Sequence, residues 1–178
     1  PHGTPMNHPM VRIEGGGGGR WYTNVLLHWW DQGPDYRHLL VDRTQEPLAF
    51  YMLEPQHGRG TTMVEIRRAR NIDIFSIKME GHFGVLTMTD SRNLRLFGLA
   101  GNGMPSPGYA LLQVDNCTDY LLANINPRFK RLGHWGALGT AHHPAGWFRV
   151  IERPAPNAPA IRIPGTDQFV LYLRGNPH

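Results

Sequence analysis

Three segments in the middle of the chain line up with one another, and a fourth fits more loosely. They begin at Val64, Leu86 and Leu112, with the looser unit led by Leu40, so the lead positions are 24, 22 and 26 residues apart. A period that drifts in this range is typical of the coils of a parallel β-helix, whereas helical repeats keep a fixed, longer period. The spacing predicts an all-β fold, a right-handed parallel β-helix of about four to six coils of 22–26 residues.

Apolar and polar residues alternate within each unit. Val64 and Ile66 alternate with Glu65 and Arg67, and later segments repeat the pattern. A period of two places the apolar side chains on one face of a strand. The 21 Gly and 15 Pro favour many turns, which agrees with short strands. An antiparallel β-sandwich would show similar strands, but it does not require equal side-chain types at equal offsets.

The residues at the turns of the repeat do show equal side-chain types at equal offsets. Asn71 and Asn93 fall at the same place in their units, with Thr118 third in line. Asn tolerates a left-handed backbone and can bond to the backbone of the next coil. We therefore expect a polar ladder at this corner of the coils.

Aromatic residues recur in the same way. Phe75 and Phe97 coincide in the alignment, with Leu122 below them. Rings on neighbouring coils lie at the usual spacing for aromatic pairs. We expect these two rings to stack as a ladder inside the coil.

The phrases RNIDIFSIKMEG and SRNLRLFGLAGNG resemble coils of the pectate-lyase-like, right-handed β-helix superfamily. The resemblance covers residues 36–126. It implies a polysaccharide as partner, since the superfamily contains polysaccharide lyases, glycoside hydrolases, phage tailspikes and many secreted bacterial proteins. The chain contains no catalytic motif specific to that superfamily, so no residue role is transferred from it.

The ends of the chain are patterned differently from the middle. Residues 1–35 would form an N-terminal arm, a Gly-rich segment and a first coil, and residues 36–126 the central coils. Residues 127–178 would form a long loop excursion followed by a final pair of strands at 160–163 and 169–174. The glycines at 15–19 fit either a flexible loop or close backbone packing. The open ends of such a fold could pair with another chain.

One group of candidate site residues follows the second strand of each coil. Aligning LEPQHG, KMEGHFG and LAGNG brings Glu54, Glu80 and Asn102 to similar depths, with His57 and His82 nearby. A carboxylate beside a His is a suitable acid–base pair, and two carboxylates suit glycoside hydrolysis. Glu54, His57, Glu80 and His82 are therefore the candidate catalytic residues. The alternative is that they are solvated loop residues without a partner.

A second group lies in the segment LHWWDQGPDYRH. Its Trp29, Trp30 and Tyr36 could stack on sugar rings, and Arg37 could pair with a uronate carboxylate. With Asn102, these are the candidate substrate-binding residues. The alternative is that the two tryptophans close the end of the hydrophobic core.

The charge pattern bears on the partners. The chain has a formal net charge of +4, contributed mainly by scattered arginines such as Arg67, Arg68, Arg70, Arg92 and Arg95. No compact basic run with interleaved aromatics appears, so we expect no nucleic-acid partner and take these arginines as a solvated sheet face. No stretch reaches the roughly 20 apolar residues of a membrane span.

Motifs for cofactors are scarce. No HxH, HExxH or Cys/His pair is present, and we expect no transition-metal site. Asp90 and Asp115 could hold Ca²⁺, although their spacing is not that of a calcium loop. Cys117 has no cysteine partner for an internal disulfide, and we expect it to be a small buried residue.

These patterns lead to two hypotheses for function. The first is a secreted or cell-surface protein that binds or degrades carbohydrate, in the manner of a polysaccharide lyase or glycoside hydrolase. The second is a non-catalytic structural solenoid, such as a surface fibre, a tail component or a filament subunit. The sequence leaves open whether the protein is an enzyme.

Overall fold

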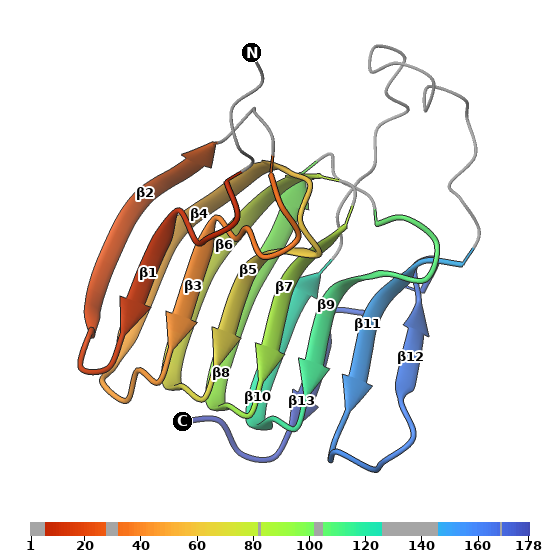
Figure 1. The fold of residues 1–178 in the computed structure, drawn as a ribbon. Coiled ribbons are helices and arrows are strands. Elements are labelled where there is room, and N and C mark those ends of the chain that lie inside the picture. Colours follow the sequence, from red (N-terminus) through yellow and green to blue (C-terminus); the bar gives the residue numbers. More distant parts are fainter. Residues whose placement is uncertain (1–5, 28–31, 82, 102–104, 126–145, 168) are drawn as a thin grey trace, which may run out of the picture.

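The protein is an all-β solenoid of about four turns, as seen in a computed structural model that describes residues 6–27, 32–81, 83–101, 105–125, 146–167 and 169–178 (Figure 1). The chain descends through a front sheet and ascends through a rear sheet as it advances from β1 to β11, which is a right-handed path. The parallel β-helix architecture predicted from the repeat is confirmed. Within the described ranges, no helix is long and apolar enough to cross a membrane.

Odd-numbered strands build the front sheet, with β12 added at its end, and even-numbered strands build the rear sheet, with β13 added at its end. The front sheet consists of β1 (Val11–Glu14), β3 (Leu39–Asp42), β5 (Thr62–Arg67), β7 (Gly84–Thr89), β9 (Ala110–Asp115), β11 (Phe148–Arg153) and β12 (Ile161–Pro164). The rear sheet consists of β2 (Gly19–Leu27), β4 (Leu48–Gly58), β6 (Arg70–Gly81), β8 (Arg92–Gly101), β10 (Thr118–Ile125) and β13 (Leu171–Arg174).

In-register pairing arranges the core as columns of apolar side chains. Val64 lies between Leu39 and Leu86 in the front sheet, and all three are buried. The alignment that placed Leu40 in the lead position is wrong by one residue, because Leu40 is opposite Glu65. All four residues of β3 are buried, so alternation of polarity could not settle the register of that strand.

The corners from β5 to β6, from β7 to β8 and from β9 to β10 each contain two residues with a left-handed backbone, whereas the corner from β3 to β4 contains one, Arg43. The first corner column contains Arg43, Arg68, Asp90 and Asn116, all with φ between 50° and 58°. In the second column, the Asn93 side-chain amide donates to Asn71 Oδ1 at 2.7 Å, which is the polar ladder expected at this corner. Its third member is Asp119 (φ 53°) rather than Thr118, which pairs with Arg92.

The rear strands bend once more at a shared position. Thr23, Met52, Ser76, Gly98 and Asn124 all have positive φ, and the pairing on either side of each shows that they lie in one column. Such a backbone costs free energy for most side chains, so it persists only where the neighbouring rungs fix it. The bend divides the outer face of the rear sheet into two halves.

The two ends of the chain differ from the sequence-based expectations in detail. The glycines at 15–18 form the connection from β1 to β2, and Gly19 begins β2. A Cβ on Gly18 would lie 2.9 Å from the carbonyl oxygen of Pro47. β12 and β13 both form, but they do not pair with each other. β12 pairs antiparallel with β11, and β13 pairs antiparallel with β10.

A buried carboxylate ties the two end strands to the core. Glu152 occupies the column of Val114, yet it is only 1 % exposed. Arg174 on β13 donates to it at 2.9 and 3.0 Å, and the Tyr172 hydroxyl also donates to it. Burial acts to raise the pKa of Glu152, but the hydrogen bonds from Arg174 and Tyr172 outweigh burial and the pKa is lowered. This ion pair therefore links β11 in the front sheet to β13 in the rear sheet.

Replacing Arg174 by Met should destabilise the protein through this carboxylate. We expect the free energy of unfolding to fall by about 3 kcal/mol, because a buried charge loses its partner. Denaturant unfolding at neutral pH measures the change. Arg20→Met is the matched control on the same sheet, since Arg20 is exposed and forms no ion pair within the described part of the chain, and it should cost less than about 0.5 kcal/mol.

The same carboxylate predicts a pH dependence of stability. Because the pKa of Glu152 is lowered from 4.5 on folding, its contribution is complete above pH 4.5 and is lost as the pH falls through the lower folded-state value. Glu152→Gln should therefore flatten the unfolding free energy against pH below 4.5. An unchanged slope in that variant would contradict the assignment.

Candidate functional site

A cluster of ionisable side chains lies on the outer face of the rear sheet, beyond the bend. Lys78 Nζ is 3.2 Å from Glu80 Oε1 and 3.9 Å from Glu54 Oε2, so one cation lies between two carboxylates. His57 Nε2 lies 3.5 Å from Glu80 Oε2. Gln56 donates to Glu54 at 3.0 Å. Glu54, Gln56, His57, Lys78 and Glu80 are called the acid–base cluster below.

Strand alternation explains why these residues face outward. On β4 Leu53 and Pro55 are buried, and on β6 Ile77 and Met79 are buried. The residues between them must then point to the opposite face. Parallel pairing of β4 with β6 brings the two sets of outward side chains together.

The acid–base cluster is accessible to a ligand. The exposed fractions of its side chains are 17 % for Glu54, 24 % for Glu80, 22 % for His57 and 42 % for Lys78. Partial burial strengthens the interactions between these charges, while the exposed part of each side chain remains in contact with solvent. A carboxylate in contact with a His can take up a proton from a substrate or donate one to it.

The structure brings together three of the four candidate catalytic residues, Glu54, His57 and Glu80. Their register differs from the one that the sequence alignment predicted. Glu80 is paired with Gln56, and Glu54 precedes Gln56 by two residues on β4. The two glutamates are therefore not at the same depth, and Lys78, which sequence reasoning missed, connects them. The signal for it was its place two residues before Glu80 on the same face of a strand. His82 and Asn102 lie outside the described residues.

The second candidate group is not assembled as a sugar-stacking surface. Trp29 and Trp30 lie outside the described residues. Tyr36 is only 1 % exposed and packs edge-on against His38, and its burial raises its pKa to about 12. The expectation that Tyr36 stacks on a ligand is therefore wrong.

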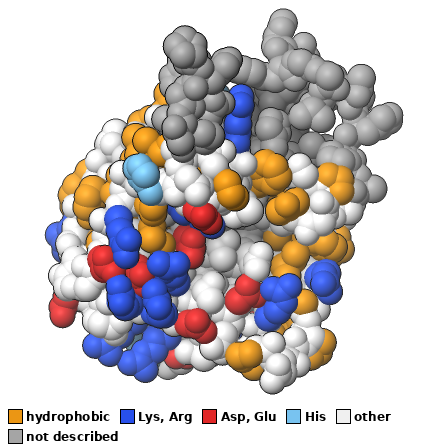
Figure 2. Space-filling view, in the orientation of Figure 1, with side chains coloured by type: hydrophobic (Ala, Val, Ile, Leu, Met, Phe, Trp, Pro, Cys, Tyr) orange, Lys and Arg blue, Asp and Glu red, His pale blue; other side chains and the backbone are white. Residues whose placement is uncertain are grey.

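Arg37 is also engaged within the protein. Its guanidinium lies 2.8 Å from Glu65 on the next coil and donates to the carbonyl groups of Pro34 and Tyr36. Figure 2 shows acidic and basic side chains intermixed over this outer face of the front sheet. Pairing of Arg37 with a uronate would require the loss of these bonds, and we correct that expectation. The contact with Glu65 depends on the register of two coils, which the sequence alone does not fix.

The aromatic ladder lies on the outer face instead of inside the coil. Phe75 and Phe97 stack with centroids 5.2 Å apart, and the ladder continues through Tyr51 to Tyr22 at 4.9 Å per step. In the other direction the column continues with Ala123, not Leu122, which is buried. The rings of neighbouring coils cover one another's faces, so the ladder chiefly stabilises the sheet.

The remaining candidates show no assembled site. Cys117 is buried, which raises its pKa to about 12 and makes its thiol a poor nucleophile. Asp90 accepts from Asn116, and Asp115 accepts from Gln113 and Arg153. Across the described ranges, no three His, Cys, Asp or Glu side chains gather as a metal site would require.

Comparison of the chain with protein-family models, with curated proteins and with solved structures finds no match. The geometry of this chain therefore carries the functional argument.

A double-mutant cycle tests the aromatic ladder. We expect Phe75→Leu and Phe97→Leu to show a coupling energy of about 0.5–1.5 kcal/mol in the free energy of unfolding, because the stacked pair contributes beyond its buried area. The control cycle joins Phe75→Leu to Phe148→Leu on the front sheet, where coupling should stay within about 0.5 kcal/mol. Equal coupling in both cycles would show that stacking contributes nothing specific.

Proposed function

We propose that this protein binds a polysaccharide on the outer face of the rear sheet and that the acid–base cluster acts on it. The supporting observation is a partly exposed cluster on a strand surface, in which Lys78 lies between Glu54 and Glu80 and the imidazole of His57 lies beside Glu80. Such a surface is extended along the solenoid, which suits a long polymer better than a compact metabolite.

The roles within the proposed site follow from the contacts. The Glu80–His57 pair is the base, since each can accept a proton while the other holds it in place. Lys78 lies between the two glutamates and offsets the repulsion between their charges. Glu54 is the second carboxyl, which would serve as the proton donor in a hydrolase. Lyase and hydrolase remain the two reaction classes of this proposal.

The proposal includes a carbohydrate partner and a location outside the cell or on its surface. The resemblance of residues 36–126 to the pectate-lyase-like superfamily supports a carbohydrate partner and a secreted or cell-surface location. The fold itself serves many functions, so the cluster and not the solenoid carries the argument.

A structural, non-catalytic role is the second candidate, and one observation favours it. β2 is a nine-residue edge strand in which Arg20 is the one charged residue. Its Trp21, Tyr22 and Val25 are 39 %, 63 % and 52 % exposed. Proteins usually protect such edges with charges, proline or short strands, so this edge is suited to pairing with another chain.

Incubation with a panel of uronate-containing and neutral polysaccharides tests the enzymatic proposal. New reducing ends measure cleavage, and ultraviolet absorbance of unsaturated uronates separates elimination from hydrolysis. Glu80→Gln should lower kcat by about 10²–10⁴-fold, the usual contribution of a general base. Glu46→Gln is the control, because Glu46 is an exposed carboxyl outside the cluster and its loss should leave kcat unchanged.

Two outcomes would reject this proposal. One is full cleavage activity in Glu80→Gln, which would exclude the cluster as the centre of the reaction. The other is the absence of cleavage across the panel, together with sedimentation of the wild-type protein as an assembly that Tyr22→Lys on β2 dissociates. That result would establish the structural role.

A further inference from the structure

An open groove with a volume of about 350 Å³ lies at the corner where the coils pass from the front sheet to the rear sheet. It extends over several neighbouring coils and is lined mainly by polar side chains. Its lining includes Arg68, Arg70, Asp90, Ser91, Arg92 and Thr118. We call this surface the corner groove.

The backbone of the corner explains its shape. Arg68 and Asp90, with left-handed backbone, form one side, while Arg70 and Arg92 begin the rear strands on the other. Between them lie Ala69 and Ser91, which are 3 % and 4 % exposed. Small side chains at this position leave the floor of the groove low, so the flanking side chains stand above it.

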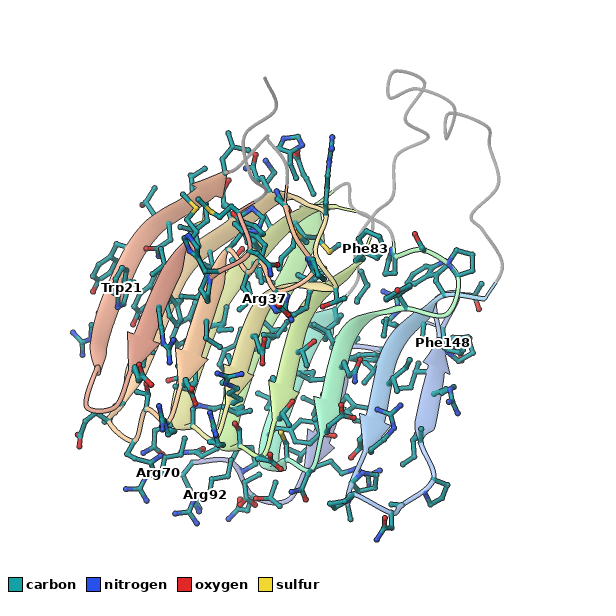
Figure 3. The ribbon with its side chains drawn as sticks, in the orientation of Figure 1. Trp21, Arg37, Arg70, Phe83, Arg92 and Phe148 are labelled. Carbon is teal, nitrogen blue, oxygen red and sulfur yellow. The ribbon has the colours of Figure 1, made fainter. Side chains whose placement is uncertain are left out.

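Two arginines face the solvent side by side on neighbouring coils. Arg70 and Arg92 are paired in register, and Figure 3 shows both projecting from the lower end of the stack. Neither forms an ion pair with any residue that the structure describes, and Arg70 donates one long bond of 3.4 Å to the carbonyl of Gln45.

Other arginines of the stack are neutralised by carboxylates. Arg95, on the same strand as Arg92, binds both oxygens of Asp73 at 2.6 and 2.7 Å. Arg68 likewise binds Asp42. Equal charges directly opposite in a sheet destabilise it, so the Arg70–Arg92 pair is unfavourable unless an anion joins it.

We propose that the corner groove binds an oxyanion group of an acidic polysaccharide, a sulfate ester or a carboxylate, between Arg70 and Arg92. Guanidinium groups present paired donors that match both groups. The Thr118 hydroxyl lies in the next coil of the same column and adds a donor. Asp90 occupies the opposite side and keeps the bound group on the arginine side.

The lining favours a glycan over a nucleic acid. None of the residues that line the groove is aromatic, whereas binding of single-stranded nucleic acid relies on stacking of bases on aromatic rings. The groove follows the solenoid axis, so a linear polymer can continue beyond the bound group. This proposal does not rest on the acid–base cluster, which lies beyond the bend on another part of the surface.

Binding to three polymers with one backbone tests the proposal. Dextran sulfate and carboxymethyl dextran carry the two oxyanions, and unmodified dextran carries neither. Calorimetric titration at physiological salt should show binding to at least one charged polymer and none to dextran. The variant Arg70→Gln with Arg92→Gln should weaken that binding by about tenfold or more, because it removes charge-assisted hydrogen bonds.

A matched variant separates a site from general attraction between opposite charges. Arg20→Gln with Arg162→Gln also removes two positive charges, but from exposed positions on β2 and β12 that lie outside the groove. It should change the dissociation constant by less than about twofold at physiological salt. Equal losses in the two variants would overturn the proposal, as would binding of unmodified dextran or tighter binding of a single-stranded oligonucleotide. Arg92→Gln alone, at an exposed side chain, provides the same comparison if the double variant fails to fold.

The groove and the acid–base cluster can be tested apart. Loss of binding in the Arg70/Arg92 variant with intact cleavage would leave the proposed function unaffected. Loss of cleavage in Glu80→Gln should leave binding of the charged dextran unchanged.

Discussion

Parallel pairing in register governs this molecule, because it places strand residues of one coil directly beside their counterparts on the next. Leu39, Val64 and Leu86 share one column of the core, and Phe75 and Phe97 share one column outside it. A side chain that suits one coil therefore has to suit its two neighbours as well. The corners follow the same constraint, since a left-handed backbone recurs at one position in four successive coils, at Arg43, Arg68, Asp90 and Asn116.

The same constraint makes charge placement informative. In one outward column Asp73 is next to Arg95, and in another Asp42 is next to Arg67, so opposite charges are stacked. Glu152 is tolerated in an apolar column because Arg174 reaches it from the other sheet. Against this background, Arg70 beside Arg92 departs from the pattern of the stack. A departure of this kind, in a concave place, is where binding is best sought.

The architecture could be predicted from the sequence because its signals are local. Alternation of Val64 with Glu65 and recurrence of Asn71 as Asn93 require only the strand period and the coil length. The errors were of one residue, at Leu40, Thr118 and Leu122. Corners of unequal length shift the register between coils, and a short apolar strand offers no polar residue to reveal the shift.

The sites were harder to predict because they depend on contacts between coils. Glu54, His57 and Glu80 were recognised by residue type, but the position of Lys78 between the carboxylates required the pairing of β4 with β6. Residue type alone favours Tyr36 and Arg37 as sugar-binding residues, because the burial of Tyr36 and the pairing of Arg37 with Glu65 depend on other coils. The arginines of the corner groove are dispersed in the sequence, because Arg70 and Arg92 line the same groove although 22 residues separate them.

The two ends of the solenoid differ, and this limits how copies could assemble. β2 is long and nearly uncharged, whereas β12 and β13 are four-residue strands that carry Arg162, Pro164 and Arg174. Continuous growth of a polymer needs both ends to accept a neighbour. A molecule with one receptive end instead closes with a second copy around a twofold axis, and the assembly stops at two.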